Sequence, residues 1–168
     1  MKMATRVNRR FIREKEARKL LSEFRKIINL TVSQLPALKP PLELADTKEG
    51  EIFFVDNNPV LVRSGVDIFP TLKSQTVLSQ MPKAVVNSGA VPHICNGADV
   101  MAPGIVQFEG VFSKGNMVVV IDENHRKPIA IVVALYDTKT AETLKRGKIL
   151  KNIHYVGDKL WKAIKMVN

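Results

Sequence analysis

The second half of the chain is a series of short apolar runs separated by glycine, proline, asparagine and aspartate residues, and this pattern limits the possible folds most. Runs this short suit strands better than helices. Only brief helices fit between them, one that Ser88 is expected to cap and one that Asp137 is expected to cap. The sequence therefore predicts a small, closed or nearly closed β-barrel with short helices. The expected strands are Ala84–Val86, Ile105–Phe108, Met117–Ile121, Pro128–Leu135 and Ile149–Val156.

The first half of the chain has a different pattern and predicts a small α/β domain. Apolar residues recur at three- and four-residue spacings over residues 17–28, which predicts an amphipathic helix with one buried face. Two β-rich runs, 51–55 and 59–63, flank Asp56-Asn57-Asn58 and predict a hairpin. A short helix is expected over residues 69–78, with Pro70 in its first turn.

The boundary between these two patterns lies at Met81-Pro82. The expected fold class is therefore α+β, with an N-terminal domain over residues 1–81 and a barrel domain over residues 83–168. Asp158 is expected to cap a terminal helix, and Trp161 is expected to pack that helix onto the barrel.

Charge is the strongest indication of a partner, because the chain carries a formal net charge of +10. Residues 1–26 have a net charge of +7 and residues 141–168 a net charge of +5, whereas the middle is slightly acidic. Two basic ends fit a polyanion, since lysine and arginine gain free energy by displacing counterions from phosphates. The alternative is that the basic surface only keeps the protein in solution. Arg6, Arg9, Arg10 and Arg13 are expected to add affinity for RNA without adding specificity.

Several classes of function have little support in the sequence. Cys95 is the single cysteine, which excludes an internal disulfide and fits a reducing, cytoplasmic compartment. His93 and Cys95 lack the second pair of ligands that a zinc site needs, so we expect no metal and no cofactor. No apolar run is long enough to predict a membrane span, and there is no secretory signal. No nucleotide-binding loop or catalytic set is present, so we expect no enzyme activity.

Over residues 83–161 the sequence resembles a PUA domain, a domain named for pseudouridine synthases and archaeosine transglycosylases. The most specific segment is Gly-Ala-Asp-Val-x-x-Pro-Gly at Gly97–Gly104, and Lys114-Gly115-Asn116 departs slightly from the Gly-Asp that the family usually has. The segments that carry the resemblance are AVVNSGAVPHICNGADVMAPGI, FSKGNMVVVIDENHRKPIAIVVALY and LKRGKILKNIHYVGDKLW.

The chain also resembles the malignant T-cell amplified sequence family of translation proteins, through Phe53-Phe54, Ile68–Leu72 and Asn152–Trp161. This resemblance is strong over about half of the chain and weaker over residues 1–80. The short length and basic character suggest an archaeal relative. This resemblance implies a small α/β domain before the PUA domain, RNA binding at the small ribosomal subunit, and a role in translation initiation or recycling. It also implies a partner with an initiation-factor-one-like, or SUI, domain.

We refer to residues 97–104 as the glycine loop, and we expect it to contact RNA. Glycine allows close approach of a ligand to the backbone, whose N–H groups can donate to phosphate or to base edges. The alternative is that its glycines and Pro103 only turn a corner of the barrel. Asp99 is expected to bond backbone N–H groups and shape the turn. The members of the expected RNA site in the loop are Gly97, Ala98, Asp99, Val100, Met101, Ala102, Pro103 and Gly104.

Basic residues outside the loop are expected to bind phosphates, and Tyr155 either stacks on a base or packs in the core. These basic residues are Arg126, Lys127, Lys145, Arg146, Lys148 and Lys151. The sequence therefore favours a cytoplasmic RNA-binding protein of the translation apparatus, with ribosomal RNA or transfer RNA as its partner. The alternative is an adaptor that docks a translation factor through the N-terminal domain and uses the PUA domain as a scaffold.

Overall fold

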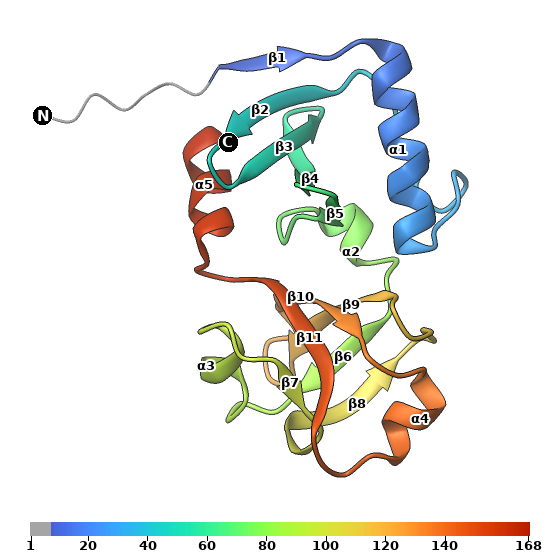
Figure 1. Ribbon diagram of the computed structural model, residues 1–168, viewed down its shortest axis with the longest axis vertical. Coiled ribbons are helices and arrows are strands. Elements are labelled where there is room, and N and C mark those ends of the chain that lie inside the picture. The colour runs from blue at the N-terminus through green and yellow to red at the C-terminus, as the bar shows by residue number, and fades with distance from the viewer. Residues whose placement is uncertain (1–7) are drawn as a thin grey trace, which may run out of the picture.

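The computed structural model describes residues 8–168, which form two β-sheets with short connecting helices (Figure 1). The first sheet has five antiparallel strands in the order β1-β2-β3-β4-β5. The elements of this part are β1 (Arg9–Phe11), α1 (Glu14–Ile28), β2 (Glu43–Thr47), β3 (Gly50–Val55), β4 (Asn58–Ser64), β5 (Asp67–Pro70) and α2 (Gln75–Leu78).

The second sheet has six strands in the order β7-β11-β10-β9-β6-β8. Its two edge strands, β7 and β8, are joined by a three-residue 3-10 turn, so the sheet curls into a nearly closed barrel. The α+β fold class and the predicted barrel are confirmed. The elements of this part are β6 (Lys83–Val86), α3 (Val91–Ile94), β7 (Val100–Met101), η1 (Ala102–Gly104), β8 (Ile105–Glu109), β9 (Met117–Asp122), β10 (Pro128–Ala134), α4 (Thr138–Thr143), β11 (Lys148–Tyr155) and α5 (Lys159–Val167).

The first helix and the first hairpin follow the sequence pattern. The apolar stripe of α1 is buried except for Ile27. The helix ends at Asn29, which has a left-handed backbone conformation that asparagine tolerates better than most residues do. Asp56 and Asn57 both have a positive φ, which is the backbone of a two-residue type I′ turn. That turn joins β3 to β4 and confirms the predicted hairpin.

The helix expected over residues 69–78 is confirmed only for its last four residues. Residues 67–70 instead form β5, which pairs with β4 at the edge of the sheet. Proline has no backbone N–H, and Pro70 is compatible with an edge strand because the side of that strand that faces solvent needs no donor. The Thr71 hydroxyl then donates to the carbonyl of Pro59 at 2.7 Å, which ends the strand before α2 begins.

Helices cover both faces of the first sheet, and the side chains along its strands alternate between two apolar clusters. Phe53 belongs to the cluster that includes α1, whereas Ile52 and Phe54 belong to the cluster that includes α5. The buried residues of α5 therefore pack against the N-terminal sheet (Figure 1). Trp161 is half-buried and packs against the cluster of α1, which also holds Val119 and Ile131 of the barrel, so it does not join the helix to the barrel alone. Leu160, Ile164 and Val167 are the buried residues of α5.

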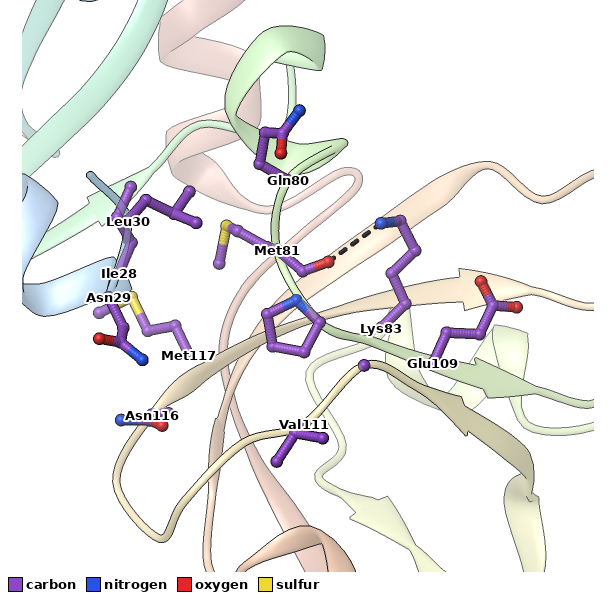
Figure 2. Close-up of a pocket in the computed structure, with 12 residues that line it drawn as sticks. Ile28, Asn29, Leu30, Gln80, Met81, Lys83, Glu109, Val111, Asn116 and Met117 are labelled. Carbon is purple, nitrogen blue, oxygen red and sulfur yellow. Dashed lines mark hydrogen bonds between the residues drawn. The ribbon is translucent and has the colours of Figure 1, made fainter. Parts of the chain in front are cut away.

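The two parts of the chain also share apolar residues where they meet. Val85, Val119, Ile121 and Ile131 of the barrel lie in the same buried cluster as α1. Figure 2 shows Leu30, Met81 and Met117 at this junction, where a cavity of about 330 Å³ remains. The division into domains at 1–81 and 83–168 stays a prediction, and α5 crosses it by covering the N-terminal sheet.

We predict that Ile164→Ala lowers the free energy of unfolding by about 2–4 kcal/mol, because a buried side chain is removed from the contact between α5 and the sheet. Met166→Ala on the same helix is the control, since Met166 is 75% exposed and should change stability by less than about 0.5 kcal/mol. Chemical denaturation of both variants measures the difference. Equal stability of the two variants would contradict the packing of α5 described here.

Candidate nucleic-acid interface

The glycine loop forms one wall of an open pocket of about 450 Å³, which we call the loop pocket. The opposite wall is formed by α3 and the turn before it. Of the loop residues, Gly97 and Ala102 do not line the pocket. The lining residues are Asn87, Ala90, His93, Ile94, Ala98, Asp99, Val100, Met101, Pro103 and Gly104.

The two walls of the loop pocket are joined by Asn87. Its backbone N–H donates to the carbonyl of Gly104 at 2.9 Å, and its side-chain oxygen accepts from the N–H of Ala90 at 3.0 Å. The side chain that holds the turn before α3 is therefore that of Asn87. The predicted cap by Ser88 is wrong, because the Ser88 backbone N–H donates to Glu123 and its side chain does not cap the helix. Asparagine can bond backbone groups a few residues ahead, and this local signal in the sequence was missed.

Asp99 fixes the loop to strand β11. Its carboxylate accepts from the backbone N–H of Asn152 at 2.8 Å and pairs with the Lys148 ammonium at 2.8 Å. The side-chain amide of Asn152 donates to the carbonyls of Ile94 and Ala98 at 3.1 and 3.0 Å, so the end of α3 is tied to the same strand. Asp99 therefore shapes the loop as expected, but through partners about fifty residues away. Nothing in the sequence indicated the role of Asn152.

The pKa of the Asp99 carboxyl lies below its ordinary range. Burial by itself would raise this pKa, but the hydrogen bonds from Lys148 and Asn152 lower it by more. The folded state thus favours the carboxylate. This contribution to loop order is present at neutral pH and is lost as the pH falls through the lowered pKa of Asp99.

The loop residues differ in how far a ligand can reach them. Val100 is buried and pairs with Leu150 of β11, so its side chain belongs to the barrel core. Ala102 is half-buried, and its N–H donates to the carbonyl of Gly147 at 2.9 Å. The exposed side chains are those of Ala98, Pro103 and Met101, and Met101 is 48% exposed. Met101 therefore lies on the outer side of the loop.

The two loop glycines are needed for different structural reasons. Gly97 has a φ of +95°, and a Cβ there would lie 3.2 Å from the hydroxyl of Tyr155. Gly104 has no positive φ, but a Cβ there would lie 3.0 Å from the Cβ of Ala90. Close packing within the loop pocket thus accounts for Gly104. Tyr155 is half-buried, and it contacts the loop at Gly97 as well as the barrel core.

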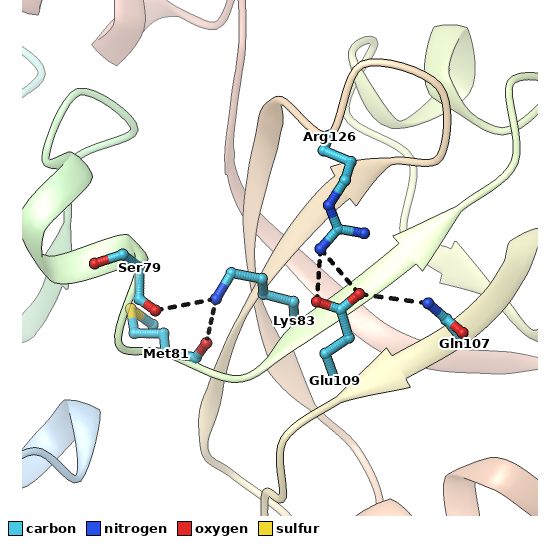
Figure 3. Close-up of polar contacts among 6 residues, drawn as sticks. All are labelled: Ser79, Met81, Lys83, Gln107, Glu109 and Arg126. Carbon is cyan, nitrogen blue, oxygen red and sulfur yellow. Dashed lines mark hydrogen bonds and ion pairs between the residues drawn. The ribbon is translucent and has the colours of Figure 1, made fainter.

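Four of the six expected phosphate-binding residues flank the glycine loop. Lys148 pairs with Asp99, Lys151 is exposed farther along β11, and Lys145 and Arg146 are exposed in the turn before β11. The other two lie in the turn between β9 and β10. Figure 3 shows that Arg126 donates twice to Glu109, at 2.7 and 2.9 Å, instead of pointing to the loop.

One of the basic residues at the start of the chain, Arg9, is bound to other residues of the protein. Arg9 pairs with Glu43 at 3.1 Å, donates to Asn57, and lies 3.8 Å from the ring centre of Phe54. Arg9 therefore has a structural role in the first sheet, which differs from the expected contact with RNA. Arg10 and Arg13 are exposed, and Arg6 lies outside the described residues.

Other kinds of site find no support in the part of the chain that the structure describes. Residues 8–168 contain no cluster of three His, Cys, Asp or Glu side chains that could hold a metal ion. Burial raises the pKa of the Cys95 thiol, which disfavours the thiolate that a nucleophile requires. None of the helices within these residues is long and apolar enough to cross a bilayer.

Two family models match successive parts of the chain. Residues 82–156 match the PUA domain, and residues 8–75 match a domain of unknown function, DUF1947. An uncharacterized protein of Methanocaldococcus jannaschii is 38% identical over 156 residues, which cover 91% of this chain and 94% of that protein. The chain belongs to the PUA-domain family. Its PUA segment ends before α5, the helix that covers the N-terminal sheet.

Further relatives agree with this assignment. Translation machinery-associated protein 20 of Saccharomyces cerevisiae is 25% identical over 154 residues, covering 85% of this chain and 83% of the relative. This match confirms the resemblance to a family of translation proteins. A PUA domain structure from Aeropyrum pernix K1, a tartrate complex, is 28% identical with a TM-score of 0.82, and the match covers 95% of this chain and 92% of that one.

The tRNA pseudouridine synthases among the relatives match the PUA segment alone. A probable tRNA pseudouridine synthase B of Pyrobaculum islandicum is 34% identical over 80 residues, which cover 48% of this chain and 24% of that enzyme. The PUA domain is an RNA-binding module, so the shared part accounts for RNA binding and not for catalysis.

We predict that Asp99→Ala speeds hydrogen exchange of the Ala98–Met101 amides, because the loop loses its link to β11. In the parent protein the same amides should lose protection as the pH falls through the lowered pKa of Asp99, where the carboxylate becomes protonated. In Asp99→Ala their protection factors should stay low across this pH range. Loop protection that does not change with pH in the parent would refute the assignment.

A second prediction concerns Gly104 and Ala90. Gly104→Ala should destabilise the protein by about 1 kcal/mol, because the added methyl group lies too close to Ala90. The double variant with Ala90→Gly should recover part of this loss, since it removes the opposing methyl group. Thermal unfolding of the three variants measures the coupling. Additive effects would show that the two positions do not touch.

Proposed function

We propose that this protein binds structured RNA of the translation apparatus at the loop pocket, with the glycine loop as the recognition surface. The single observation that carries the proposal is the position of the loop. The most specific PUA segment of the sequence lines an open pocket. Lys148 of β11 pairs with Asp99 in the lining of that pocket, and further cations are exposed on β11 and in the turn before it. Exposed cations at the rim can hold phosphates while the pocket accepts an unpaired nucleotide.

The electrostatics of the pocket support a phosphate ligand. The one carboxylate in the loop, Asp99, is already neutralised by Lys148, so it adds little repulsion toward an anion. Lys145, Arg146 and Lys151 take part in none of the ion pairs found within residues 8–168. These three cations can therefore gain the full free energy of counterion release when a phosphate binds.

We infer the role in translation from the relatives. The yeast relatives are named for the translation machinery, and they cover most of the chain. Ribosomal RNA and transfer RNA are the proposed ligands, with the small ribosomal subunit as the site of action and initiation or recycling as the step. A SUI-domain factor is a proposed partner, the cytoplasm is the proposed location, and the protein acts without catalysis or a cofactor.

The first test is direct binding of a labelled tRNA transcript and of a ribosomal RNA hairpin of similar length. We expect binding without added metal or nucleotide, and a loss of affinity between about 50 and 200 mM salt, because phosphate contacts release counterions. Fluorescence anisotropy at several salt concentrations gives the slope. Affinity that ignores salt for both RNAs would refute the proposal.

The second test replaces the exposed side chain of the loop by a negative charge. Met101→Glu should weaken RNA binding about five- to tenfold, since a carboxylate near a phosphate costs about 1 kcal/mol in water. Its melting temperature should stay within a few degrees of the parent, because Met101 is exposed. Val66→Glu is the control, since Val66 is 96% exposed and lies in the turn between β4 and β5, outside the loop pocket.

The two variants carry the same added charge, so a difference between them reports the place of binding. Equal affinities for Met101→Glu and Val66→Glu, with both proteins folded, would remove the glycine loop as the recognition surface. The adaptor hypothesis would then be the better account.

A further inference from the structure

Helix α5 presents a basic face on the side away from the N-terminal sheet. Its buried residues Leu160, Ile164 and Val167 pack on the sheet. Its other face carries Lys159, Lys162 and Lys165, all of which are exposed. Residues three apart are neighbours on a helix, so the three ammonium groups form one stripe. The helix contains no acidic residue.

Lys73 extends this stripe across Trp161. The Lys73 ammonium lies 4.2 Å from the centre of the Trp161 ring, and the Lys165 ammonium lies 5.2 Å from it. Among the ion pairs of the described chain, none involves Lys73 or the three lysines of α5. We call these four lysines the α5 basic patch. A surface of positive charges without ion-pair partners attracts a polyanion.

We propose that the α5 basic patch is a second contact for the backbone of the RNA that binds at the loop pocket. This inference rests on the proposed function and adds a path for the RNA across the molecule. Strand β11 leads from the loop pocket to α5, and its eight residues span roughly 26 Å at ~3.3 Å per residue. In Figure 1, α5 and α3 lie on the same side of the molecule.

The chemistry of the patch favours RNA over other anionic partners. A membrane-binding helix would insert its apolar face, but that face of α5 is buried against the sheet. The centres of protein interfaces are depleted in lysine, whereas lysine commonly contacts phosphates. Met166 is the one exposed apolar residue of α5, so the patch offers little surface for an apolar protein contact.

The test compares two sets of three lysines in the same protein. Lys159, Lys162 and Lys165 are changed to Gln in one variant, and Lys15, Lys19 and Lys26 are changed to Gln in the other. The second set is exposed on α1, on the opposite side of the N-terminal sheet from α5 (Figure 1). Both variants lose the same charge, so they separate a local contact from the effect of net charge.

The probe is the labelled tRNA transcript, measured by anisotropy at several salt concentrations. We expect the α5 variant to bind about tenfold more weakly at ~100 mM salt and to lower the salt slope by about two, since each phosphate contact contributes ~0.7–0.9 to that slope. The α1 variant should stay within about twofold of the parent. Lys159→Gln with Lys162→Gln, which leaves both contacts to Trp161 intact, should give an intermediate loss.

Two outcomes would overturn the inference. One is equal affinity and equal slope for the α5 and α1 variants while the parent binds RNA and Met101→Glu reduces that binding. The other is an α5 variant that keeps its RNA affinity but loses binding to polyglutamate, which would identify an acidic protein as the occupant. A parent protein with no salt-dependent RNA binding would instead refute the proposed function itself.

Discussion

The structure depends on the burial of both faces of the N-terminal sheet. One face packs on α1, which precedes most of the sheet in the chain, and the other packs on α5, which follows the whole barrel. A five-stranded sheet with one open apolar face would expose several large side chains to water, at a cost of about 25 cal/mol per Å². Because α5 supplies the missing cover, the two parts of the chain are joined by packing as well as by the linker at residues 79–82.

This arrangement also determines how the loop pocket is held. Strand β11 provides the anchors for the glycine loop at Lys148 and Asn152, and it continues through Asp158 into α5. The Asp158 carboxylate accepts from the Trp161 N–H at 2.6 Å and from the Tyr155 N–H at 3.0 Å, and it bonds the buried His154 ring at 2.8 Å. One strand therefore connects the candidate interface to the helix that completes the other sheet.

Much of the fold was predictable because it follows from local patterns. The barrel strands, the hairpin turn at Asp56-Asn57 and the caps at Asp137 and Asp158 all have signals within a few residues.

The packing of α5 on the N-terminal sheet was not predicted, although one sequence pattern indicated it. Residues 52–55 and 60–62 are continuously apolar, which is typical of strands buried on both faces. Between residues 8 and 81 the structure has one long helix, α1, which can cover only one of these faces. The partners of Asp99 were beyond prediction, because they lie on a distant strand whose register sets the contact. Gly104 was correctly located in the loop, but its neighbour Ala90 became visible only in three dimensions.

Because α5 comes last in the chain, one face of the N-terminal sheet is synthesised long before the helix that covers it. The residues that face α5, such as Phe54 and Phe69, leave the ribosome about a hundred residues before the helix that covers them. During that interval an apolar surface stays in contact with water, and such surfaces bind chaperones or other nascent chains. The first sheet is fully covered only after the barrel has been synthesised. Substitutions in α5 that weaken its packing therefore expose the apolar face of the N-terminal sheet.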